Sequence, residues 1–102
     1  MALESALHAA EAEVSSHGVV AIYHPKPIIP DDLLREVHST TVVARFYIEA
    51  DGSMRVELLI PSRNPRLNRL VLETLKTWRF KPAMKDGHPI ASTVDSRGGF
   101  AE

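Results

Sequence analysis

The strongest constraint on the fold is an alternating stretch interrupted by an Asp-Gly pair. From Thr41 to Glu49 apolar side chains occupy every second position, and the alternation resumes from Met54 to Ile60. Neighbouring side chains of a strand point to opposite faces, so each stretch predicts a strand with one apolar face. Asp51-Gly52 is a typical hairpin turn and predicts a positive φ at Gly52. The predicted core-facing residues are Val42, Ala44, Phe46 and Ile48, then Met54, Val56, Leu58 and Ile60.

The segment after this ribbon provides a cover for its apolar face, which a two-stranded ribbon needs. Asn64-Pro65 is a typical helix start, with Asn as the cap and Pro at the first helical position. Apolar residues then recur at helical spacing as far as Trp78, and Pro82 ends the helix. We therefore predict one long helix on the apolar face, with Trp78 buried against the sheet. The apolar positions are Leu67, Leu70, Val71, Leu75 and Trp78.

A last strand is predicted after a second turn signal, Asp86-Gly87. It runs from Pro89 to Asp95, and Gly98-Gly99 ends it. A helix between the second and last strands favours a right-handed crossover, and the simplest solution places the last strand beside the first. We predict an α+β fold with a three-stranded antiparallel sheet in the order second–first–last. Its last strand is an open edge that can pair with another chain.

The N-terminal region carries weaker signals. Ala2 to Ser16 favours a short helix with a narrow apolar stripe, and Val19 to Tyr23 predicts a short strand. The expected organisation is an N-terminal helix and linker remnant over residues 1–24 and one domain over residues 25–102. The stripe consists of Leu3, Leu7, Ala10 and Val14.

The start of the main domain is rich in proline. Pro25, Pro27 and Pro30 predict extended chain, because proline fixes φ and removes a backbone donor. Asp31-Asp32 then caps a short helix that runs to about Val37.

Templates for an enzyme or a metal site are missing from the sequence. The chain has no cysteine, and none of its five histidines pair at a metal-ligand spacing. The glycines form no phosphate-binding loop, and the serines form no nucleophile elbow. Basic residues cluster between Arg63 and Lys85, but Phe and Tyr do not interleave with them, so we predict no nucleic-acid partner. We expect a non-enzymatic domain without a cofactor or metal.

Four motifs, in this order, resemble the TonB C-terminal domain family. They are a proline-containing start at Pro27–Pro30, a strand with its Asp-Gly turn at Val42–Gly52, a helix closing with Trp-Arg-Phe-Lys-Pro at Pro82, and a Gly-x-Pro turn with a final strand at Gly87–Val94. The resemblance extends from Pro25 to Phe100, about three quarters of the chain. Ile29 stands where the family often has Tyr.

The resemblance implies the periplasmic domain of a TonB-type energy transducer. Such proteins are anchored in the inner membrane of Gram-negative bacteria. They couple proton-motive force, through an inner-membrane proton-channel complex, to TonB-dependent outer-membrane transporters. The C-terminal domain binds a short transporter segment, the TonB box, as an added β-strand. The chain lacks the family's membrane helix and proline-rich spacer, so we expect an excised domain rather than a soluble relative.

The open edge and the resemblance together predict a partner-peptide site, in which free backbone groups provide the affinity. Its predicted residues are Ile90, Ala91, Ser92, Thr93, Val94, Asp95, Ser96 and Arg97 on the edge strand, with Pro27, Ile28, Ile29 and Pro30 beside it. In an alternative hypothesis the same edge pairs two copies as a homodimer, reinforced by the Leu3–Val14 stripe. A small-ligand or enzyme domain is a third hypothesis. RNA binding is a fourth, but only Tyr47 offers an aromatic ring on the exposed sheet face.

Overall fold

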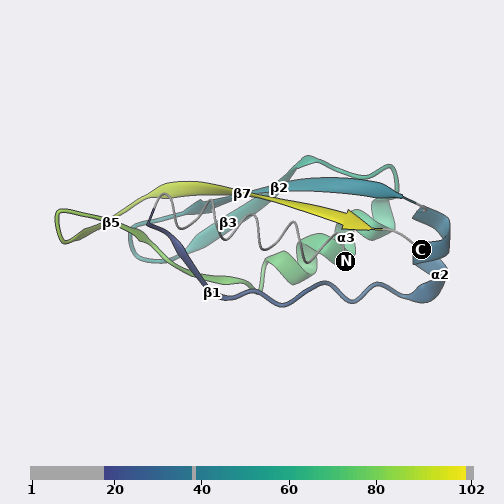
Figure 1. The fold of residues 1–102 in the computed structure, drawn as a ribbon, viewed down its shortest axis with the longest axis horizontal. Helices are drawn as coiled ribbons and strands as arrows, with labels where there is room; N and C mark the ends of the chain where they lie inside the picture. The colour runs from purple at the N-terminus through teal and green to yellow at the C-terminus, as the bar shows by residue number, and fades with distance from the viewer. Residues whose placement is uncertain (1–17, 38, 101–102) are drawn as a thin grey trace.

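The centre of the molecule is a three-stranded antiparallel sheet. The computed structural model describes residues 18–37 and 39–100, so the predicted N-terminal helix lies outside the described residues. The sheet order is β3-β2-β7, which is the predicted order second–first–last. Helix α3 lies across one face of this sheet, as Figure 1 shows, and the α+β class is confirmed. The strands are Thr40–Ile48 (β2), Met54–Ile60 (β3) and Ser92–Phe100 (β7), and α3 is Pro65–Leu75.

The β2–β3 ribbon forms where the alternation predicts it. The inward residues of β2, from Val42 to Ile48, are all buried, and Phe46 is fully enclosed. Gly52 adopts a φ of 90°, as predicted, and its amide donates to the carbonyl of Glu49 over 3.0 Å. The prediction that Ile60 faces the core is wrong, because its side chain is 57% exposed. The register shifts between Val43 and Ala44, which adds a residue to β3 and turns Ile60 outward.

Helix α3 is shorter than predicted. Asn64 caps it as expected, since its side-chain oxygen accepts from the amides of Arg66 and Leu67. The helix ends at Leu75, and the amides of Thr77 and Trp78 donate to carbonyls three residues earlier. This tighter turn points the indole inward without continuing the helix.

Trp78 is nevertheless at the centre of the core, as predicted. It is 3% exposed and stacks on Phe46 with ring centroids 5.1 Å apart. Its Nε1 donates to the carbonyl of Pro25 over 2.9 Å. Phe80 tilts against the Phe46 ring with centroids 5.0 Å apart, so three aromatic rings meet beneath the sheet.

Two short ribbons extend the fold in ways that the sequence did not predict. The predicted N-terminal strand is present as β1, Val20–Tyr23, and it pairs with β4, Arg79–Lys81. Strands β5, Ala83–Lys85, and β6, His88–Ile90, form a hairpin with positive φ at Asp86 and Gly87. Figure 1 shows this hairpin projecting from one end of the molecule.

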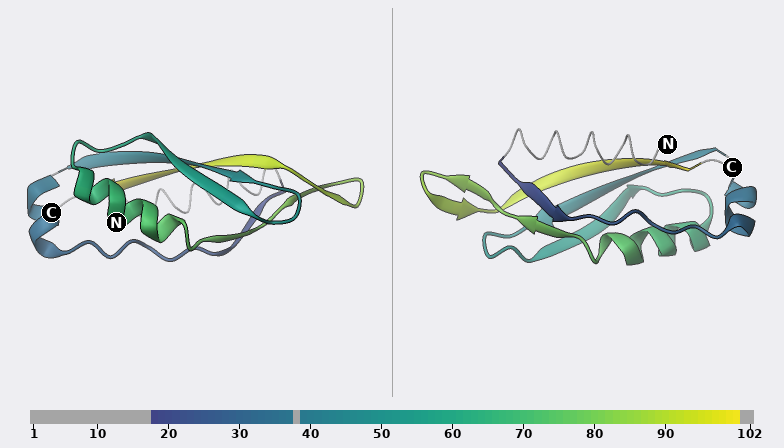
Figure 2. Two further views of the ribbon diagram at one scale, coloured as in Figure 1. Left: turned by 180° about the vertical axis from the view of Figure 1, so that it is seen from behind. Right: turned by 60° about the horizontal axis from the view of Figure 1, so that its bottom comes forward.

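The prolines between β1 and α2 form an extended strap, defined here as residues 24–30. The strap and α3 lie on the same side of the three-stranded sheet in Figure 2. Pro27 is buried and Ile29 packs against the core, so alternate strap residues face inward. The strap leads into α2, Asp31–Val37, as predicted, and Leu33 is fully buried.

The last strand differs from its prediction at both ends. Ile90 belongs to β6, and Ala91 lies between β6 and β7, so neither is part of the edge strand. Gly98 and Gly99 do not end β7, which continues to Phe100. Phe100 is buried, and burial of this ring outweighs the low strand preference of the glycines. Within the described residues no helix is long and apolar enough to cross a membrane.

Candidate functional site

Among the described strands, β7 has the longest edge that no other strand pairs with. All nine residues of β7 pair with β2, from Ser92 opposite Ile48 to Phe100 opposite Thr40, with no break in register. No other described strand pairs with the far side of β7. In an antiparallel pair, residues alternate in directing their backbone groups toward one neighbour and then away from it. Every second residue of β7 therefore directs its N–H and C=O away from β2, where an added strand would bind.

The inner face of β7 carries small side chains near the strap. Val94 and Phe100 are buried, with Ser96 and Gly98 between them. Ser96, Gly98 and Phe100 line a cavity of about 20 Å³ together with Pro27 of the strap. The strap therefore reaches the underside of the edge strand.

The outer face of β7 is tied to β2 by an ion pair. Arg45 donates from Nε to Oδ1 of Asp95 over 2.7 Å and from a terminal nitrogen to Oδ2 over 3.0 Å. This bidentate geometry fixes the two side chains relative to each other. The hydrogen bond from Arg45 holds the pKa of Asp95 below its usual value, against a smaller opposing effect of burial. The pair therefore stabilises the central register of the edge strand.

The same face continues as a polar network onto β3. The Tyr47 hydroxyl donates to the carboxylate of Glu57, and this hydrogen bond raises the pKa of Tyr47. The guanidinium of Arg55 lies 4.0 Å from the centroid of the Tyr47 ring, within the range of a cation–π contact. The tyrosine ring is thus engaged within the sheet, which weakens the hypothesis that it serves as a stacking platform for RNA.

The predicted site residues do not all come together. Thr93, Asp95 and Arg97 lie on the outer face of β7, whereas Val94 and Ser96 lie on its buried face. In the strap, Pro27 approaches β7 while Ile28 is 90% exposed. Pro30 lies at the start of α2, where its carbonyl accepts from Leu33 and Leu34. The strap is therefore positioned beside the edge mainly through Pro27, and Ile90 and Ala91 stand apart.

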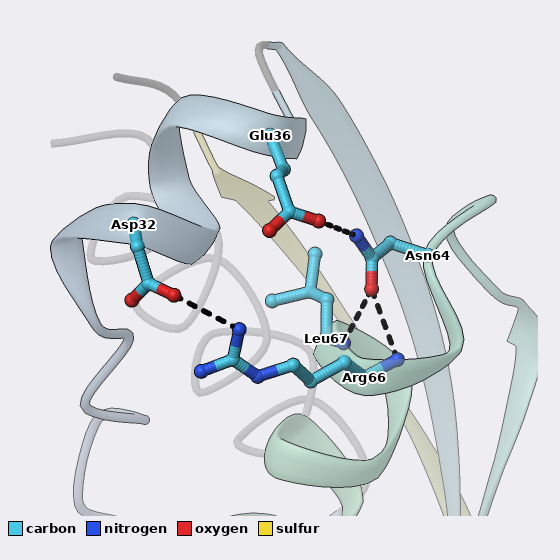
Figure 3. A network of polar contacts seen from close by, with 5 residues as sticks. All are labelled: Asp32, Glu36, Asn64, Arg66 and Leu67. Carbon is cyan, nitrogen blue, oxygen red and sulfur yellow. Dashed lines mark hydrogen bonds and ion pairs between the residues drawn. The ribbon is translucent and has the colours of Figure 1, made fainter.

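A separate groove lies between α2 and the start of α3, with a volume of about 560 Å³. Figure 3 shows the polar contacts that join these helices. Asp32 and Arg66 form an ion pair of 3.1 Å, which lowers the pKa of Asp32, and Asn64 donates to Glu36 over 3.4 Å. Of these residues Glu36 and Asn64 line the groove, so their hydrogen bond joins its two walls. Within residues 18–37 and 39–100, no group of three or more metal-ligating side chains is present.

The comparisons with known proteins agree with this geometry. The family model for the Gram-negative bacterial TonB protein C-terminal region matches residues 25–100. The chain belongs to the TonB C-terminal domain family. The family is a non-enzymatic interaction and transducer domain of the periplasm in Gram-negative bacteria.

The fold of this TonB C-terminal domain is also similar to a solved structure. It superimposes on the solution structure of the Pseudomonas aeruginosa TonB C-terminal domain with a TM-score of 0.62. The two chains are 22% identical, and the match covers 83% of this chain and 87% of the other. At this identity the likeness shows the fold alone. No curated protein sequence matches the chain.

The sequence indicated the edge of this TonB C-terminal domain but not the contacts that brace it. Arg45 and Asp95 both occupy outward positions of predicted strands, and their opposite charges suit a cross-strand pair. Arg45 and Asp95 meet only if β2 and β7 pair in one particular register. The two strands are far apart in the sequence, so the sequence did not determine this register. Opposite charges at outward positions were therefore the only sequence signal of this pair.

Proposed function

We propose that this domain binds the TonB box of an outer-membrane transporter by adding it as a strand to β7. Through the rest of a TonB-type protein, this contact would couple inner-membrane proton-motive force to active uptake. The observation that carries the proposal is the nine-residue edge of β7, paired on one side only among the described strands. Strand addition suits such an edge, because main-chain hydrogen bonds give affinity without a pocket.

The structure of the edge favours pairing over side-chain recognition. Val94, Ser96 and Phe100 are buried against the core and are not available to choose a partner. Asp95 is already held by Arg45. Affinity should therefore depend mainly on backbone groups, with Pro27 limiting what can approach from below.

The direct test is titration with a peptide that carries a TonB box, followed by amide NMR. The largest shifts are expected along residues 92–100, with smaller shifts at Ile28 and Ile29. A peptide of the same composition in scrambled order, with a proline at its centre, is the control. Shifts confined to α3 would contradict the proposal.

A self-association measurement separates this function from the homodimer. If β7 pairs two copies, the molecular mass will rise with concentration and the peptide will dissociate the dimer. If the mass stays that of one chain while the peptide binds, the edge serves a heterologous partner.

A further inference from the structure

A second exposed surface lies at the end of the molecule that carries the hairpin. Most of the large hydrophobic side chains that the described residues expose are found there, on β1 and on the β5–β6 hairpin. Ile22 is 60% exposed, Tyr23 54% and Met84 57%. We call β1 together with residues 79–90 the arm surface. Its exposed hydrophobic residues are Val20, Ile22, Tyr23, Met84 and Ile90.

The register explains why these side chains remain outside. Val20 is paired with Lys81 and Tyr23 with Arg79, and cross-strand partners share a face of the ribbon. Ala21 is paired with Phe80, which is buried, so the opposite face of the ribbon packs on the core. The irregularity between Ala21 and Tyr23 leaves Ile22 as an extra exposed residue.

The hairpin continues this surface outward. At Gly18 an added Cβ would lie 3.7 Å from the amide nitrogen of Met84, so the chain just before β1 lies against the base of the hairpin. Met84 is paired with Pro89, and Lys85 with His88, at the projecting tip seen in Figure 1. Adjacent pairs lie on opposite faces of the hairpin, so Met84 is on one face and Lys85 shares the other face with Ile90.

The charge of the arm surface is positive. The arm surface contains three cationic side chains, Arg79, Lys81 and Lys85, and one carboxylate, Asp86, so its net charge is +2. Strand β1 contributes no charged residue. All three cations are exposed. No hydrogen bond or ion pair of the described residues engages either lysine, and the guanidinium of Arg79 reaches only its neighbouring carbonyl over 3.4 Å. The complementary partner is anionic.

We propose that the arm surface binds an anionic phospholipid surface. Its cations Arg79 and Lys81 form a row on β4 directly opposite the apolar Tyr23 and Val20 of β1, whereas a protein interface gathers apolar residues in a centre and places charges at its rim. Neighbouring rows of cations and apolar side chains suit the boundary between headgroups and acyl chains, where tyrosine is also favoured. A projecting hairpin can meet a plane while β7 remains open to a peptide. The proposal uses no residue of β7 and does not depend on the proposed function.

The test is sedimentation of the full chain with vesicles of phosphatidylcholine alone, or of phosphatidylcholine with phosphatidylglycerol. Binding is expected only to the vesicles that contain phosphatidylglycerol, and it should weaken at high salt. Lys81→Gln combined with Lys85→Gln should lower the partition coefficient roughly 30-fold, from about 1 kcal/mol per cation near an anionic surface. The matched control is Arg63→Gln with Arg69→Gln, which removes the same charge beside and within α3 and should leave binding nearly unchanged.

A second variant pair tests the apolar part of the surface. Ile22→Ser should weaken binding roughly tenfold or more, because an inserted Ile side chain leaves water. Ile60→Ser removes the same side chain from a similarly exposed position at the end of β3 and should have no effect. Circular dichroism and thermal melting verify that each variant is folded.

Several outcomes would overturn the proposal. These are no binding to phosphatidylglycerol vesicles, equal losses in the two charge variants, or no loss with Ile22→Ser. As a further comparison, the chain is titrated with poly-glutamate and with the vesicles while the amide NMR signals of the arm surface are followed. If poly-glutamate shifts these signals and the vesicles do not, the surface binds an acidic protein partner instead.

Discussion

The stacked Trp78 offers the clearest test of how this domain is held together. Trp78→Ala removes a side chain that is 3% exposed and that contacts both Phe46 and Phe80. Deleting a buried Trp costs about 3–5 kcal/mol, and an aromatic pair adds about 0.5–1.5 kcal/mol beyond area burial. The indole also donates to Pro25, and the loss of this bond leaves an unsatisfied carbonyl. We therefore expect a loss at the upper end, about 4–5 kcal/mol.

Such a loss should be measured by urea unfolding followed by circular dichroism, because the variant lacks its only Trp. It approaches the whole stability of an ordinary domain, about 5–15 kcal/mol, so much of the variant should be unfolded at modest urea. Met84→Ala is the matched control, since Met84 is 57% exposed, and it should change stability by less than about 0.5 kcal/mol.

Trp78→Phe separates the hydrogen bond from the stacking. The ring contact with Phe46 is retained while the donor to Pro25 is lost, so the cost should fall to about 2 kcal/mol. The amide signals of Ile28 and Ile29 should shift, because the strap loses an anchor. A cost below about 1 kcal/mol for Trp78→Ala would refute the reasoning, since it would mean that the core closes without the indole.

The remaining predictions concern the turn, the outer ion pair and the edge. Gly52→Val should destabilise the domain by about 1–3 kcal/mol, because φ is 90° there, while peptide affinity of the folded fraction stays unchanged. The depressed pKa of Asp95 stabilises the fold above the unfolded pKa of about 3.9, and this stability is lost as pH falls through the lower folded value. The stability difference between wild type and Asp95→Asn, measured by denaturant, should therefore shrink from neutral to strongly acidic pH; a constant difference would contradict it. Thr93→Ala should barely change peptide affinity by calorimetry. Ser96 and Arg97 are neighbours, so the amide of one points toward β2 and the amide of the other points to the free edge, and hydrogen exchange identifies which is which. Proline at the residue with the freely exchanging amide should abolish peptide binding and leave the fold intact, whereas proline at the other residue should lower the stability of the domain. If both variants lost the same stability and the same peptide affinity, β7 would have no free edge.

The parts of the fold that depend on local chemistry were predictable. Strands β2 and β3 were predicted because alternation and an Asp-Gly turn act within a few residues. The cap at Asn64 was predictable for the same reason. The predicted sheet order was correct because a helical crossover leaves few topologies.

The parts that depend on distant partners were not predictable. Strands β4, β5 and β6 are only three residues each and contain or adjoin prolines, so no periodicity marks them. The spacing of apolar residues predicted a helix that continues to Trp78. The observed helix ends earlier, where the Thr77 hydroxyl donates to the Thr74 carbonyl over 2.7 Å and competes with the helical hydrogen bonds. Of the candidate site, the edge strand was predicted, but its bounds were displaced because burial of Phe100 extends it beyond Gly99.

The continuous register between β2 and β7 has a mechanical consequence. A pull along the axis of β7 loads all nine residue pairs in shear at once, because no bulge interrupts the ladder. A pull across the axis would instead open the pairs one after another. The β1–β4 and β5–β6 ribbons have only three pairs each and should peel away first under tension. The direction of an applied force therefore decides whether this small domain behaves as a rigid link or as a chain that unravels.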